Sequence, residues 1–73
     1  MDEQELKERM LRESGEFRKI YEEHQGYEQE LAEIKLKSFL TEAEKLREKQ
    51  LKKKKLLLKD QMYRMMAEFR KSV

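Results

Sequence analysis

The chain has 73 residues and a net charge of +2, with 47% charged and 37% hydrophobic residues and no cysteine, proline or tryptophan. Its length allows one domain with a thin core, and the lack of cysteine excludes disulfides and thiolate chemistry. High charge also suits a disordered chain, but the apolar periodicity and the Glu, Lys and Leu content favour long helices or a coiled coil. The acidic N-terminus, MDEQELKERM, does not resemble a signal peptide, and no apolar run is long enough to span a membrane, so we expect a cytoplasmic protein.

The first expected helix covers about residues 2–13 and carries Leu6 and Met10 on one face, four positions apart. The sequence then interrupts the helical pattern. Ser14 can cap the N-terminus of a new helix, and Gly15, a weak helix former, suits a joint between two helices.

Two longer helices follow, at about residues 16–37 and about residues 42–71, with a turn at about residues 38–41. Thr41 followed three positions later by Glu44 is the pattern of a capping box, which marks the start of the third helix. Each long helix carries one apolar stripe in which steps of three and four residues alternate. The stripe of the second helix contains Phe17, Ile20, His24, Tyr27, Leu31 and Ile34, and that of the third contains Leu51, Lys55, Leu58, Met62, Met65 and Phe69.

The stripes predict an all-α fold: a single domain over residues 1–73, built as an antiparallel two-helix hairpin with a short N-terminal helix. Residues 1–37 carry eleven acids and seven bases, a net charge of −4, whereas residues 38–73 carry five acids and eleven bases, a net charge of +6. Opposite charges therefore favour the same pairing. Folding the chain about residue 39 places Phe17 near Met62, Ile20 near Leu58, Tyr27 near Leu51 and Met10 near Phe69.

Four consecutive lysines, Lys52 to Lys55, fall opposite the acidic part of the second helix. We expect Lys52, Lys53 and Lys54 to form surface ion pairs with the acidic block from Glu23 to Glu30. Lys55 occupies a stripe position, so its methylene groups should lie along the core while its charge reaches solvent.

Two segments carry a family resemblance: EFRKIYEEHQGYEQEL at residues 16–31 and LKKKKLLLKDQMYRMM at residues 51–66. Together they resemble the YdcH-like family of small bacterial proteins, over about residues 10–70. Gly15 and Tyr27 depart from the pattern, since the family often has proline and leucine at these places. The resemblance implies a long helical hairpin and no assigned activity.

His24 is the only histidine, and we interpret it as a structural residue, partly buried between the helices near Lys54, Lys55 or Leu58. A pH-sensing role is the alternative, because the unperturbed pKa of histidine lies near 6.5. A metal site needs several converging ligands, and the sequence shows no catalytic triad or phosphate-binding loop. We therefore expect no enzyme, no metal and no cofactor.

The expected function is that of a protein–protein interaction or structural module that self-associates as a dimer, forming a four-helix bundle. The side chains expected at the self-association surface are Phe39, Leu40, Leu46, Leu57 and Met66. The alternative is weak nucleic-acid binding through the basic third helix, with contacts from Lys52, Lys53, Lys54, Lys59 and Arg64. Membrane binding is not expected, since the apolar surface is small and lacks a tryptophan anchor.

Overall fold

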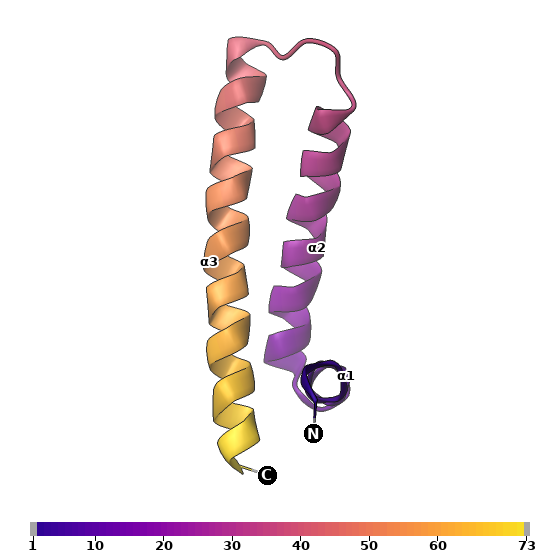
Figure 1. The fold of residues 1–73 in the computed structure, drawn as a ribbon, viewed down its shortest axis with the longest axis vertical. Helices are drawn as coiled ribbons and strands as arrows, with labels where there is room; N and C mark the ends of the chain where they lie inside the picture. Colours follow the sequence, from indigo (N-terminus) through magenta and orange to yellow (C-terminus); the bar gives the residue numbers. More distant parts are fainter. Residues whose placement is uncertain (1, 73) are drawn as a thin grey trace.

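The computed structural model describes residues 2–72 and contains three helices: α1 (Glu3–Glu13), α2 (Gly15–Lys35) and α3 (Glu42–Ser72). α2 and α3 lie side by side along the long axis, joined at one end by residues 36–41, and α1 crosses the other end of this pair (Figure 1). The molecule is elongated, with dimensions of 48 × 20 × 17 Å. The prediction of an all-helical chain with three helices is confirmed for the described residues.

A single residue, Ser14, separates α1 from α2. Its backbone N–H donates a hydrogen bond to the carbonyl of Met10 (2.8 Å), which ends α1. Its side-chain Oγ accepts a hydrogen bond from the backbone N–H of Phe17 (3.1 Å), which begins α2. Because Ser14 has an extended backbone between two helical neighbours, the chain changes direction at this point.

The start of α3 shows the predicted capping box. The Thr41 backbone N–H donates to Glu44 Oε1 (2.9 Å), and the Glu44 backbone N–H donates to Thr41 Oγ1 (3.1 Å). At the other side of the connection, α2 ends at Lys35, two residues before the predicted end at residue 37. The last turn tightens there, since the N–H groups of Leu36 and Lys37 bond to carbonyls three residues earlier, and the helix does not continue.

The core consists of two separate clusters along the interface. The larger contains Leu6, Met10, Phe17, Ile20, Met62 and Met66, with Leu11, Tyr21, Leu58, Met65 and Phe69 packed against it. The smaller contains Leu31, Ile34 and Leu51, with Tyr27 and Leu40 packed against it. Every apolar stripe residue predicted from the sequence is thus buried or half-buried. Between the clusters, the stripe positions are held by His24 and Lys55, which are polar.

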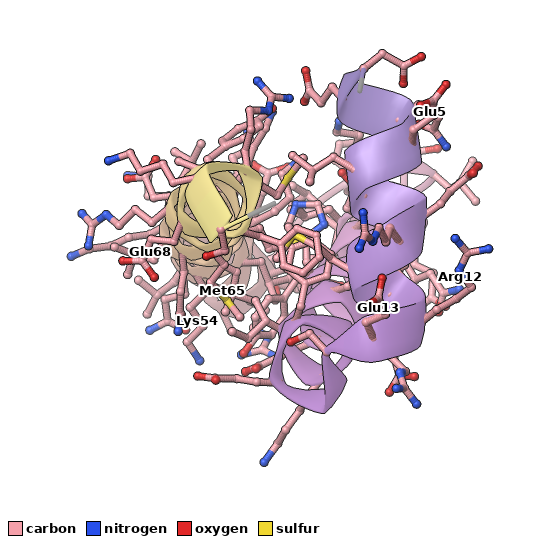
Figure 2. All side chains as sticks on the ribbon, turned by 90° about the horizontal axis from the view of Figure 1, so that it is seen from below. Glu5, Arg12, Glu13, Lys54, Met65 and Glu68 are labelled. Atoms are coloured by element: carbon pink, nitrogen blue, oxygen red, sulfur yellow. The ribbon has the colours of Figure 1, made fainter. Side chains whose placement is uncertain are left out.

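α1 contributes to the larger cluster through one face. Leu6 and Met10 are buried there. Figure 2 looks along α3 and shows Glu5 and Arg12 on the side of α1 that points away from α3. The short helix therefore closes one end of the core with its apolar face and presents charges to solvent.

Candidate functional site

The apolar residues expected at a self-association surface differ in exposure. Phe39, Leu46 and Leu57 are exposed, at 89%, 58% and 61% of their full area. Leu40 is half-buried against the smaller core cluster. The prediction is wrong for Met66, which is only 7% exposed, because α1 crosses over it and packs Leu6 and Met10 into the same cluster.

Sequence reasoning missed Leu36, which is 86% exposed in the connection. The sequence does carry a signal for this exposure. Leu36 comes two residues after Ile34, which lies on the apolar stripe of α2, and so Leu36 points away from the stripe. Leu46 and Leu57 lie about three helical turns apart and so share one side of α3. We call Leu36 and Phe39 in the connection, together with Leu46 and Leu57 on that side of α3, the apolar edge.

The lysine run does not pair as predicted. Lys52 Nζ lies 3.9 Å from Glu48 Oε1 of its own helix, and Lys54 Nζ lies 5.9 Å from the centre of the Tyr27 ring. Within residues 2–72, Lys53 forms no ion pair. The expected bridges from Lys52, Lys53 and Lys54 to the acidic block of α2 are therefore wrong, because consecutive residues point in directions about 100° apart and only some can face α2.

Two other side chains of α3 form the cross-helix ion pairs. The Arg47 guanidinium donates to both carboxylate oxygens of Glu30, at 3.0 to 3.2 Å. Lys55 Nζ lies 3.5 Å from Glu28 Oε1, and the Lys55 side chain is half-buried at its stripe position. The charge match between α2 and α3 exists, but it is made by Arg47 and Lys55 and not by Lys52, Lys53 or Lys54.

The five residues considered for nucleic-acid contact do not gather on one face. Helical geometry turns Lys53 and Arg64 to one side of α3, and Lys52 and Lys59 to another. Lys54 leans toward α2 over the Tyr27 ring, and Lys59 lines a pocket beside His24. The structure therefore offers no continuous basic track made of these residues.

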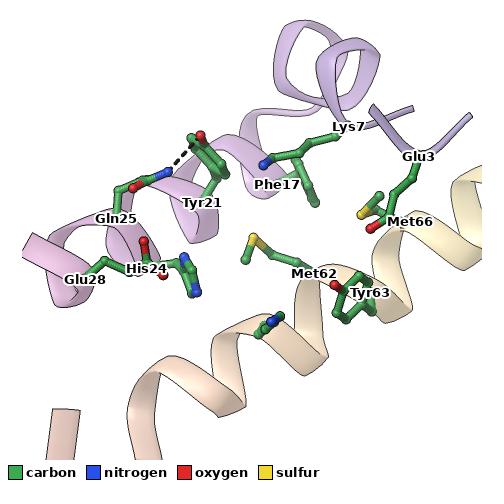
Figure 3. Close-up of a pocket in the computed structure, with 11 residues that line it drawn as sticks. Glu3, Lys7, Phe17, Tyr21, His24, Gln25, Glu28, Met62, Tyr63 and Met66 are labelled. Atoms are coloured by element: carbon green, nitrogen blue, oxygen red, sulfur yellow. Dashed lines mark hydrogen bonds between the residues drawn. The ribbon is translucent and has the colours of Figure 1, made fainter. Parts of the chain in front are cut away.

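A pocket of about 230 Å³ lies where the three helices meet. Figure 3 shows His24, Tyr21 and Gln25 from α2 on one wall and Met62, Tyr63 and Met66 from α3 opposite, with Glu3 and Lys7 reaching in from α1. Phe17, Glu28 and Lys59 complete the lining. Gln25 Nε2 donates to the Tyr21 hydroxyl at 2.8 Å, which fixes part of the rim.

His24 is half-buried in this pocket, as the sequence predicted, and its Nε2 atom is enclosed without a hydrogen-bond partner. Desolvation lowers the pKa of His24 below 6.5; Glu28 opposes this shift, whereas the positive charges of Lys55, Lys59 and Lys7 add to it. Burial of the ring therefore favours the neutral form of the imidazole. Among residues 2–72, no three His, Asp or Glu side chains converge to hold a metal ion.

Two further observations concern membrane crossing and the pKa values of two side chains. None of the three helices, within the part that the structure describes, is long and apolar enough to cross a membrane. The pKa of Tyr27 is raised by desolvation and by its hydrogen bond to Glu23. The pKa of Glu44 is lowered to about 2, chiefly by its hydrogen bond with Lys37.

Comparison with known proteins places most of the chain in a known family. The model of the family described as a protein of unknown function, DUF465, matches residues 17–66, which span α2 from Phe17 and most of α3 but leave α1 outside. No curated protein and no solved structure matches the chain. The matched segment contains both stretches that carried the YdcH-like resemblance, except for Glu16 at the start of the first, and that resemblance is confirmed. The chain belongs to the DUF465 family of proteins of unknown function, of which YdcH is also a member.

Proposed function

We propose that this protein is a cytoplasmic, non-enzymatic interaction module: an antiparallel helical hairpin of α2 and α3 that pairs with a second copy through the apolar edge. The observation that carries the proposal is the exposure of Leu36 and Phe39 in the connection and of Leu46 and Leu57 on one side of α3. Scattered single apolar residues need no partner, but four large ones along a common edge do suggest one.

The size of the core supports self-association. Nine apolar side chains are buried in the described chain, in two clusters along an elongated pair of helices. Small chains with thin cores gain stability by burying further surface against another copy, and closed two-fold pairing is the commonest arrangement.

Charge supports the same partner. α2 carries six acids and three bases, whereas α3 carries five acids and eleven bases. In a two-fold dimer the basic α3 of one copy can approach the acidic α2 of the other at two equivalent places beside the paired apolar edges.

Sedimentation equilibrium over a concentration series tests the proposal. We expect the wild type to approach about 18 kDa, twice the 9.0 kDa chain mass, and the double variant Leu46→Gln, Leu57→Gln to remain at the mass of one chain. Leu56→Gln is the matched control, because Leu56 is equally exposed but points to another side of α3. A wild type that sediments as one chain and melts at a temperature independent of concentration would contradict the proposal.

Nucleic-acid binding is the alternative function, and the same purified protein can be tested for bound nucleic acid. The dispersed directions of Lys52, Lys53 and Lys54 argue against it, so we expect the purified protein to be free of nucleic acid. Sub-micromolar binding to duplex or single-stranded nucleic acid at physiological salt, lost when Lys52, Lys53 and Lys54 are all changed to Gln, would replace the interaction-module proposal.

A further inference from the structure

The pocket between the three helices has a polar end and an apolar end. At the polar end, Figure 3 shows the His24 imidazole turned toward the space between α2 and α3, and Lys59 is part of the same lining. Toward the other end lie Phe17, Met62 and Met66, all buried core residues. A ligand that fits this shape carries one polar group and a short apolar part.

The charges at the polar end favour an anion. Glu28, the acid that raises the pKa of His24, forms an ion pair with Lys55. Lys59 and Lys7 form no ion pair within residues 2–72, although the Lys7 ammonium lies 4.9 Å from the centre of the Tyr21 ring. Two ammonium groups without an acidic partner thus accompany the enclosed imidazole.

A second and independent observation is that the Nε2 atom of His24 has no hydrogen-bond partner, which is rare for a buried polar atom. This atom is closed to solvent, so a ligand in the pocket reaches it only after the imidazole ring turns. A carboxylate accepts a hydrogen bond from the imidazole N–H once the ring has turned, and nearby ammonium groups attract it. Glu3 lines the pocket next to Tyr63 and Met66, at the apolar end, and its charge disfavours a carboxylate there.

We propose that this pocket binds a small organic carboxylate with an apolar tail. The carboxylate lies between His24 and Lys59, and the tail lies along Met62 and Met66, which keep some accessible surface. The site is independent of the apolar edge, so its existence does not rest on self-association.

Binding of such a ligand is coupled to the protonation of His24. The charged groups that face the imidazole are Glu28 of α2, Lys55 and Lys59 of α3, and Lys7 of α1. Adding a carboxylate to this group raises the pKa of His24, so the complex takes up a proton. Affinity therefore increases as the pH falls through the pKa of His24, and His24→Gln removes this dependence.

NMR titration of the full chain with hexanoate tests the site, with the methyl signals of Met62 and Met66 and the ring signals of His24 as reporters. We expect saturable shifts of these signals. Acetate, which lacks the tail, and hexanamide, which lacks the charge, should each bind about tenfold more weakly. Lys59→Gln should weaken hexanoate binding by about twofold to fivefold, the range expected for one partly exposed ion pair.

Lys53→Gln is the matched control, because it removes the same charge from the same helix on an exposed side away from the pocket. It should leave hexanoate affinity unchanged. The proposal is overturned if hexanoate at tens of millimolar produces no saturable shift, if hexanamide binds as well as hexanoate, or if Lys53→Gln weakens binding as much as Lys59→Gln. Unchanged signals elsewhere in the spectrum of each variant confirm that it folds.

Discussion

Replacing Leu51 by alanine tests the smaller core cluster. Leu51 is 0% exposed and packs with Leu31 and Ile34, while the half-buried Tyr27 and Leu40 cover the cluster. Buried Leu→Ala changes cost about 2–5 kcal/mol, depending on how far the neighbours close the cavity. Because two of the covering side chains are only partly packed, they can move in, and we expect about 2–3 kcal/mol.

The total stability sets the scale of that loss. At about 0.05–0.15 kcal/mol per residue, a chain of this length has a free energy of unfolding of about 4–11 kcal/mol. Leu51→Ala should therefore fold in water but unfold at a much lower urea concentration. Circular dichroism of the helical signal during urea titration measures the change, with the slope of the transition compared between proteins to check that the unfolding reaction is the same.

Leu56→Ala provides the control, since it is the same substitution in the same helix at a side chain that is 60% exposed. It should change the free energy of unfolding by no more than about 0.5 kcal/mol. Equal losses in the two variants would refute the assignment of Leu51 to the core and of Leu56 to the surface, and so would a Leu51→Ala loss below about 1 kcal/mol.

Two further predictions concern charges. A double-mutant cycle with Lys55→Gln and Glu28→Gln should give a coupling free energy of about 0.2–1 kcal/mol that decreases in high salt, and zero coupling at low salt would refute this ion pair. The pKa of Glu44 is depressed from 4.5 to about 2, so its contribution to stability is complete above pH 4.5 and is lost as the pH falls toward 2. Acid titration of stability should show this loss in the wild type and not in Glu44→Gln, and identical acid profiles would contradict it.

Much of the local structure follows from the sequence, because it depends on neighbouring residues. At both Ser14 and Thr41, a side-chain oxygen accepts a hydrogen bond from the backbone N–H three residues later. This cap depends only on neighbouring residues, and both caps are observed. The three helices begin and end within two residues of the predicted positions. The apolar stripes are equally local, since helical spacing alone decides which residues share a face.

The errors arise where a third element or a side-chain direction decides the outcome. Met66 lies beside the stripe of α3 and is buried in the cluster to which α1 contributes Leu6 and Met10. The sequence contains the break at Ser14, yet it does not specify the angle at which α1 leaves α2. For the lysine run, net charge per segment predicted attraction between helices, but only the residues at the edge of the interface, such as Arg47 and Lys55, reach an acid on α2.

The division of the core into two clusters has a consequence for local opening. The polar positions of His24 and Lys55 separate them, so the three-residue cluster near the connection holds its end of the helices with little help from the larger one. Amide hydrogens in the last turns of α2 and the first turns of α3 should exchange with solvent faster than those around Phe17 and Met62, and uniform exchange rates would contradict this. The end that carries Leu36 and Phe39 then frays first, and a second copy bound there would slow its exchange more than exchange at the α1 end.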